Sequence, residues 1–232
     1  MRDERLEKIL ASAADLFIKI GFRKTNLEDI SRESGVSVGV IYGYFENKSC
    51  AFSAVLKHII NPEFFDGVTD FPLRQTDFSG LEGEYGSTMG KLIRDFALPL
   101  RQRRREYTLD LMLEDIYDLL APLGIASMIL AANPRMCPVI FKNFNKSRVE
   151  LSRLVEGYLR YYMDTGEART MLSPDLSARF IMESIYWWGS MEHHEDFDSS
   201  RPSISKDYAK AVCLKALYYG HFAVKDPLLM NN

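Results

Sequence analysis

Between residues 25 and 48 the chain gathers side chains whose chemistry suits contact with the phosphates of a nucleic acid. The hydroxyl and ammonium groups of this stretch belong to Thr25, Tyr42, Tyr44 and Lys48. Such groups, together with helix N-termini, meet phosphate oxygens and position a protein on nucleic acid without reading its sequence. We therefore expect these residues to contact the nucleic-acid backbone.

A run of small residues lies between these groups and could approach the edges of bases. The run consists of Ser37, Val38, Gly39 and Val40. A helix that is small at its N-terminal end can enter a major groove. Because valine cannot hydrogen-bond a base, we expect the two valines to favour contact with thymine methyl groups.

The same stretch predicts the two helices that must position these groups. Asn26, which we also place at the interface, can cap a helix over residues 27–34. Gly35 then interrupts the pattern, and Ser37 is a second capping residue that begins a short helix from residue 38 to about residue 44. Two short helices joined by a brief turn that contains glycine are typical of a helix-turn-helix unit.

The surrounding residues extend this pattern in register over the first quarter of the chain. The positions that carry it are Leu16, Phe17, Gly21, Thr25, Ile30, Gly35, Val36, Ser37, Gly39, Tyr42, Phe45 and Lys48. With them, the segment from about Arg2 to Ile60 resembles the TetR family of bacterial transcriptional regulators.

The resemblance implies an all-α protein with two domains. Residues 1–47 would form a helix-turn-helix DNA-binding domain, and residues 48–232 a helical ligand-binding and dimerisation domain. The implied function is that of a ligand-responsive regulator, expected to be a repressor that binds a palindromic operator in double-stranded DNA as a homodimer. The aromatic and methionine-rich helices favour an apolar or aromatic small-molecule effector.

An alternative stays open, namely a helical small-molecule-binding or dimerisation protein without operator binding. Residues 1–60 carry nine Lys/Arg against eight Asp/Glu, which leaves one net positive charge, while the whole chain has a net charge of −3. DNA affinity must therefore come from the local placement of charges.

Apolar spacing and stop signals predict helices along the rest of the chain. We expect them over residues 3–20, 48–60, 87–107, 109–120, 122–132, 133–165, 173–191 and 205–222. The stretch 62–86 is rich in glycine and is predicted to be mostly loop. Pro99 predicts a kink in its helix.

Aromatic side chains on these helices predict a ligand cavity. Its expected lining is Phe96, Tyr117, Phe141, Phe144, Tyr158 and Trp188. The helix over residues 173–191 is apolar nearly all round, so it must be covered on every side. In the position where the resemblance implies a dimer interface, we expect Ile181, Ile185 and Trp187 to meet a second copy.

Two charged runs allow two interpretations each. Four arginines stand at positions 101, 103, 104 and 105. They fit a solvated helix C-terminus, with binding of an anionic effector or contact with the DNA-binding part as the alternative. The consecutive residues Glu192, His193, His194 and Glu195 fit a solvated loop better than a zinc site, because neighbours in sequence point in different directions on a helix.

Composition excludes several other classes. The hydrophobic content of 47% with 26% charged residues is ordinary for a soluble protein. Three widely spaced cysteines predict neither a disulfide framework nor a metal site. We expect no signal segment and no apolar run of membrane-spanning length, and hence a cytoplasmic location. No catalytic or phosphate-loop fingerprint occurs, so neither an enzyme nor a cofactor is expected.

Overall fold

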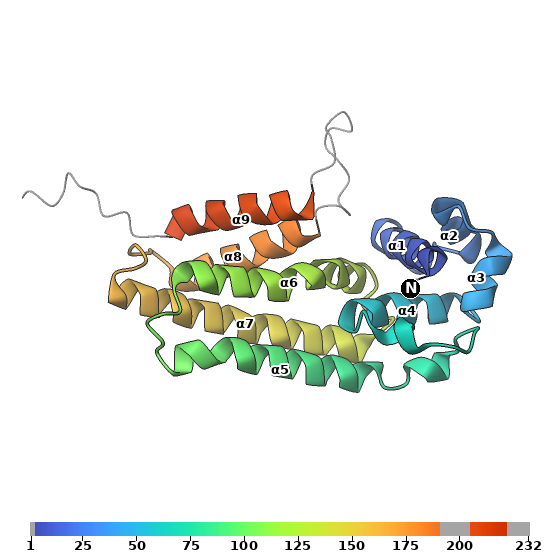
Figure 1. The fold of residues 1–232 in the computed structure, drawn as a ribbon, viewed down its shortest axis with the longest axis horizontal. Helices are drawn as coiled ribbons and strands as arrows, with labels where there is room; N and C mark the ends of the chain where they lie inside the picture. Colours follow the sequence, from blue (N-terminus) through green and yellow to red (C-terminus); the bar gives the residue numbers. More distant parts are fainter. Residues whose placement is uncertain (1–2, 191–204, 222–232) are drawn as a thin grey trace, which may run out of the picture. The chain divides into compact units, whose positions relative to one another are not determined.

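The computed structural model describes residues 3–190 and 205–221, and it builds these ranges from helices (Figure 1). The α-helices are α1 (Glu4–Lys19), α2 (Leu27–Ser34), α3 (Val38–Tyr44), α4 (Lys48–Ile60), α5 (Leu81–Arg101), α6 (Leu109–Ala132), α7 (Pro138–Thr165), α8 (Pro174–Gly189) and α9 (Lys206–His221). Two short 3-10 helices, η1 (Phe64–Gly67) and η2 (Gln75–Phe78), lie between α4 and α5. No β-strand occurs in these ranges. The predicted all-α class is confirmed.

By their packing, the helices form two compact units. The described residues of Met1–Gly90 and Ile125–Phe144 make up unit 1, and those of Lys91–Gly124 and Asn145–Asn232 make up unit 2. Unit 1 therefore contains α1 to α4 together with the start of α5, the end of α6 and the start of α7. The predicted boundary between residues 47 and 48 falls inside unit 1, and as a boundary between functional domains it stays a prediction.

The first four helices begin and end where the local sequence signals predict. Gly21 follows the end of α1 with a φ of 81°, a left-handed conformation that glycine adopts without a steric penalty. Asn61 ends α4 directly before Pro62. The buried rings of Phe17 and Phe52 pack edge to face, with 5.1 Å between their centroids. This contact gives α1 and α4 a shared aromatic core.

The prediction of mostly loop over residues 62–86 was wrong for its last six residues, because α5 begins at Leu81 rather than at residue 87. Leu81, Tyr85 and Met89 recur every four residues and are all buried. The burial of this stripe outweighs the low helix propensity of the glycines between them. The predicted C-terminal part is also shorter, since α5 ends at Arg101 and not at residue 107.

Two helix boundaries around α6 were also predicted incorrectly. Residues 109–132 form one helix, with Pro122 in its interior, rather than two. Buried side chains on both sides of the proline, Leu120 and Leu123 among them, hold the helix together despite the backbone hydrogen bond that proline removes. The next helix, α7, begins at Pro138 rather than at Asn133.

The composition of α6 also corrects the expectation about membrane spans. By length and composition alone, α6 could cross a membrane. The core helix of a soluble protein passes the same test, so the finding is weak evidence for a membrane location.

Unit 2 contains a close crossing of α6 and α8. A Cβ atom added at Gly189 would lie 2.4 Å from the Cα of Ala121. A Cβ added at Gly124 would lie 2.7 Å from the carbonyl oxygen of Tyr186. Both glycines are therefore required by the approach of the two helix backbones.

Buried tyrosines of α7 tie this helix to the end of α5 within unit 2. The Tyr158 hydroxyl donates to the carbonyl of Phe96 and accepts from the Leu100 amide at 3.1 Å. Burial raises the pKa of Tyr158 to about 12, so the hydroxyl keeps its proton and can donate. The Tyr162 hydroxyl donates to the carbonyl of Tyr107 at 2.8 Å.

Candidate nucleic-acid interface

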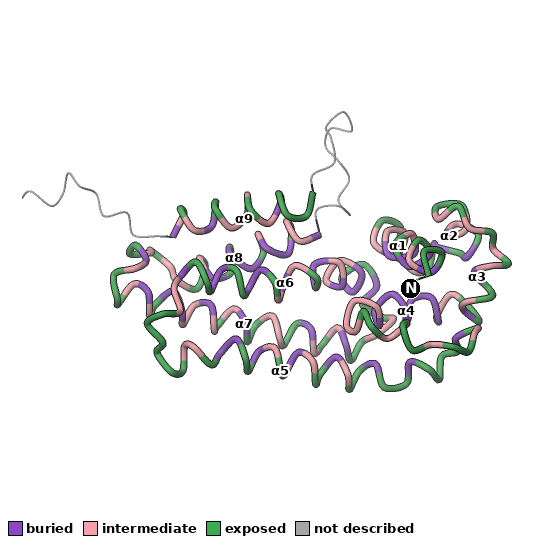
Figure 2. Tube along the Cα trace, viewed as in Figure 1, coloured by how far each residue is buried: buried purple, intermediate pink, exposed green. Residues whose placement is uncertain are grey.

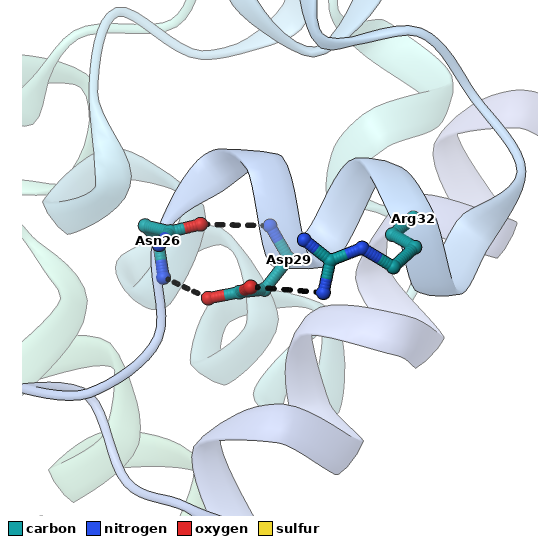
Figure 3. Close-up of polar contacts among 3 residues, drawn as sticks. All are labelled: Asn26, Asp29 and Arg32. Atoms are coloured by element: carbon teal, nitrogen blue, oxygen red, sulfur yellow. Dashed lines mark hydrogen bonds and ion pairs between the residues drawn. The ribbon is translucent and has the colours of Figure 1, made fainter.

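The interface is built on α2, whose N-terminus is closed by a capping box (Figure 3). The Asn26 side-chain oxygen accepts from the Asp29 amide at 2.8 Å, and the Asn26 amide donates to the Asp29 carboxylate at 3.0 Å. Arg32 approaches the same carboxylate at 3.4 Å. Two otherwise unpaired backbone donors are thus satisfied, which sets the angle at which the chain enters α2.

The turn between α2 and α3 is held by serine hydroxyls and one glycine. Gly35 has a φ of 68°, in the left-handed region that lets the chain reverse at the end of α2. The Ser31 hydroxyl donates to the carbonyl of Val36 at 2.7 Å, and that of Ser34 donates to the carbonyl of Ile30 at 2.7 Å. The Ser31 contact joins α2 to the turn, and the Ser34 contact lies within the last turn of α2.

One side of α3 is anchored in the core and the other faces outward (Figure 2). Ile41 and Phe45 are 0% exposed and anchor the helix in unit 1. The predicted DNA contacts Ser37, Val38, Gly39, Val40 and Tyr42 are exposed or half-buried. Tyr42 keeps 50% of its surface exposed, so its hydroxyl can reach a phosphate.

Ser37 is the N-cap of α3 by position, but the expected capping contact is absent. Its side chain makes no capping hydrogen bond. The exposed hydroxyl of Ser37 is therefore not used to close the helix, and it stands beside the first turn of α3 with the backbone amides that a nucleic-acid group can approach.

Lys48, predicted to contact phosphate, already has partners within unit 1. Its ammonium donates to the carbonyls of Phe22 at 2.7 Å and Thr25 at 2.6 Å, and it lies 4.2 Å from the centroid of the Phe22 ring. These contacts join the start of α4 to the loop between α1 and α2. Since an ammonium group has three N–H donors, one remains for a phosphate, and that contact stays a prediction.

Two other hydroxyls that were predicted to bind phosphate also form hydrogen bonds within the chain. Thr25 is 1% exposed, and its hydroxyl donates to the carbonyl of Gly21 at 2.9 Å. The Tyr44 hydroxyl donates to the carboxylate of Asp3, and burial together with that carboxylate raises the pKa of Tyr44 to about 12. Thr25 and Tyr44, like Asn26, thus form hydrogen bonds within unit 1, and their contacts with DNA stay predictions.

Sequence reasoning missed Asn133, which the structure brings to the loop behind the interface. Its amide nitrogen donates to the carbonyls of Phe17 at 2.9 Å and Ile129 at 2.8 Å, and its side-chain oxygen accepts from the Phe22 amide at 2.6 Å. Asn133 was instead predicted to open a helix together with the following proline. Its position after a long apolar helix is the only signal that the sequence offers.

Exposed cations lie along the same loop. Arg23 and Lys24 are both exposed and directly precede Thr25. They supply exposed positive charge in the loop between α1 and α2, and phosphate binding requires such charge. The arrangement can therefore position an outward-facing helix against a groove and meet the adjoining backbone with hydroxyl and cationic groups.

The residues predicted to line a ligand cavity are mostly buried. Phe96, Tyr117, Phe144 and Tyr158 are buried, and Phe141 and Trp188 are half-buried. Phe96 and Tyr158 pack against each other, with 5.2 Å between their ring centroids. Because Phe141 and Phe144 belong to unit 1 and the others to unit 2, a common cavity stays a prediction.

The predicted dimer contacts on α8 need a correction. Ile181 and Ile185 are 0% exposed in the single chain, so they are core residues with no surface to offer a partner. The exposed apolar residues of α8 are instead Leu176 at 59%, Phe180 at 62% and Trp187 at 46%. Among these, Trp187 alone was predicted, since periodicity shows which residues share a side but not which side the protomer covers.

A metal site finds no support in the part of the chain that the structure describes. No group of three or more His, Cys, Asp or Glu side chains that could hold a metal ion occurs there. Glu192, His193, His194 and Glu195 lie outside the described residues.

Comparison with known proteins agrees with this geometry. Residues 9–55 match the family model described as "Bacterial regulatory proteins, tetR family". This segment spans most of α1 through α4, including the whole of α2, the turn and α3. The segment from α1 to α4 is therefore similar to the DNA-binding domain of TetR-family regulators. The matched segment includes the residues from Ser37 to Tyr42.

Two relatives are similar to part of this chain. The HTH-type transcriptional regulator HbdR of Aromatoleum sp. (strain CIB) is 33% identical over 73 residues, which are 29% of this chain and 32% of that protein. The HTH-type transcriptional activator FasR of Mycolicibacterium smegmatis is 34% identical over 61 residues, which are 26% of this chain and 28% of that protein. The matched chain thus spans about a third of the length of these relatives.

Solved structures extend the likeness of fold to nearly the whole chain. The ketosteroid transcriptional regulator KstR2 of Mycobacterium tuberculosis has a TM-score of 0.53 and 16% identity, covering 96% of this chain and 97% of that one. The probable transcriptional regulatory protein RHA5900 also has a TM-score of 0.53, with 17% identity and coverage of 96% and 100%. At these identities the likeness concerns the fold alone.

Proposed function

We propose that this protein is a ligand-responsive repressor of the TetR family that acts in the cytoplasm and binds a near-palindromic operator as a homodimer. The outward side of α3 carries this proposal. Its small residues and exposed Tyr42 stand on a helix whose other side is anchored by fully buried Ile41 and Phe45. A rigid helix with a small, exposed N-terminal end is suited to a major groove.

Dimer formation has support from α8. Leu176, Phe180 and Trp187 leave a large apolar area exposed on one helix. Since a two-fold dimer presents two identical helix-turn-helix units, its preferred site should be near-palindromic, with half-sites about one or more turns of DNA apart. An effector in unit 2 would regulate binding only if it favours one arrangement of the two units over another.

The decisive experiment measures DNA binding directly, without knowledge of the operator. Selection from random-sequence duplexes should enrich a near-palindromic site, and affinity for that site should fall steeply with added salt. Tyr42→Phe should weaken binding to selected and random duplexes alike, since a phosphate contact carries no sequence information. Val40→Ala should instead change the preference at one position of each half-site.

Tyr208→Phe is the matched control, because Tyr208 is 64% exposed and lies on α9 in unit 2. It should bind DNA like the unmodified protein. Absence of any enriched site, with no salt dependence, would favour the alternative of a helical binding or dimerisation protein without operator binding. Because the related FasR is named an activator, a promoter-reporter assay must test repression separately.

A further inference from the structure

The basic run at the end of α5 borders a surface hollow in unit 2. The hollow has a volume of about 520 Å³ and is lined by residues at and beyond the C-terminal end of α5 and by residues of the last turns of α7. The two helix ends lie near each other (Figure 1). Three arginines line it, Arg101 and Arg103 from the end of α5 and Arg160 from α7. Residues 59 positions apart in the sequence thus bring positive charge to one place, which the run alone did not reveal.

The backbone that carries these arginines is held in place by α7. Arg103 has a φ of 48°, in the left-handed region that non-glycine residues rarely adopt. Its carbonyl accepts a hydrogen bond of 3.4 Å from the Tyr161 hydroxyl, whose ring also borders the hollow. The chain therefore turns at Arg103, and Arg101 and Arg103 both line the hollow.

The charge in the hollow is only partly neutralised. Arg160 pairs with Glu156 through Nε at 3.0 Å and one Nη2 contact at 2.8 Å, and its Nη1 group takes no part in that pair. Arg101 and Arg103 form no ion pair with any residue that the structure describes. Asp164 is the one acidic residue in the lining, so the lining has a positive net charge.

Apart from the charged residues and Thr165, the lining consists of Leu100, Tyr161 and Gly157. Leu100 and the Tyr161 ring form one part, and Gly157 leaves the backbone of α7 bare beside them. A Cβ atom at Gly157 would lie 3.0 Å from the Leu100 side chain, so the two helices approach closely at the floor of the hollow. A ligand that fits must therefore offer an anionic group to the arginines and an apolar group to this floor.

We infer that the hollow binds a small amphiphilic anion, that is, a carboxylate or phosphate joined to an apolar group. Guanidinium groups form paired, charge-assisted hydrogen bonds with both kinds of anion. The apolar wall adds burial that a bare inorganic ion cannot use. This inference concerns unit 2 and does not depend on DNA binding, because the ligand can be titrated against the protein alone.

The test is isothermal titration of the full chain with octyl phosphate, octanoate, inorganic phosphate and octan-1-ol. Octyl phosphate and octanoate should bind, and their affinities should fall as ionic strength rises. Inorganic phosphate and octan-1-ol should each bind about tenfold more weakly or worse, since each lacks one of the two groups. Comparison of the two anions shows whether a phosphate or a carboxylate is preferred.

Variants separate the hollow from general surface charge. Arg160→Gln and Arg103→Gln should each weaken octyl phosphate binding about tenfold, because each removes charge-assisted hydrogen bonds. Arg94→Gln is the control, since Arg94 is exposed on the same helix but outside the hollow, and its affinity should change less than about twofold.

Three results would overturn the inference. The first is that neither octyl phosphate nor octanoate binds, although the circular dichroism spectrum shows that the protein is folded and helical. The second is equal weakening by Arg94→Gln and Arg160→Gln, which would indicate diffuse charge. The third is binding to vesicles of anionic phospholipid without binding of octyl phosphate, which would assign the arginines to a membrane surface instead.

Discussion

Replacing Asn133 with alanine should loosen α1 and the loop that follows it. The Asn133 side chain is 7% exposed and makes three hydrogen bonds. Its amide nitrogen satisfies the carbonyl of Phe17, which lies in the last turn of α1, where carbonyls lack partners within the helix. Its oxygen satisfies the Phe22 amide in the loop beyond.

The expected cost follows from the partners that lose their hydrogen bonds. The Ile129 carbonyl also accepts from the backbone amide of Asn133 at 3.0 Å, so it keeps a partner. The Phe17 carbonyl and the Phe22 amide lose the bond, at about 1–3 kcal/mol for each buried group left unsatisfied. Because Phe22 is half-buried and water can reach part of the site, we expect about 2–4 kcal/mol in total.

Hydrogen exchange read by mass spectrometry can localise this loss. Both tryptophans of the chain are in unit 2, so their fluorescence would not report on α1. Peptides covering α1 and residues 20–26 should exchange about 30- to 1000-fold faster in Asn133→Ala, which corresponds to the free energy above. Peptides from α9 should exchange at the unmodified rate.

Asn145→Ala provides the matched control, because Asn145 is exposed on α7. Its α1 peptides should keep full protection. Asn133→Asp keeps the acceptor for the Phe22 amide but places a carboxylate against the Phe17 carbonyl, so it should lose protection as well. Unchanged protection of α1 in both Asn133 variants would refute the proposed role of this amide.

The remaining predictions concern pH, packing and assembly. Burial alone would raise the pKa of Glu84, but hydrogen bonds from Lys57 and Asn61 hold this pKa below its usual 4.5. The ionised carboxylate therefore stabilises the fold fully above pH 4.5, and this stabilisation is lost as the pH falls through the folded-state pKa. Glu84→Gln should reduce the fall in urea midpoint on acidification. Gly189→Ala should destabilise unit 2 by about 1–3 kcal/mol in tryptophan-monitored urea unfolding, through overpacking against α6, and an unchanged midpoint would contradict that crossing. Phe180→Asp should shift sedimentation toward monomers without a change in helix content, and a variant as dimeric as the parent would remove α8 from the interface.

The sequence was sufficient to predict the helix-turn-helix unit. Asn26, Gly35 and Asn61 each act on backbone groups within a few residues, so the start of α2, the turn and the end of α4 could be read from neighbours. Such signals are local, because a capping side chain or a left-handed glycine satisfies its own end of a helix. The helices of the proposed interface were predictable for the same reason, since they follow one another directly.

Which way each side chain points was decided by tertiary packing. Lys48 and Tyr44 carry the chemistry of phosphate contacts, yet their polar atoms meet Phe22, Thr25 and Asp3, residues 23 to 41 positions away. Ile181 resembles an interface residue by periodicity, but the protomer itself covers it. Hydrogen bonds and burial between distant segments depend on how whole helices pack, and neither residue type nor spacing contains that information.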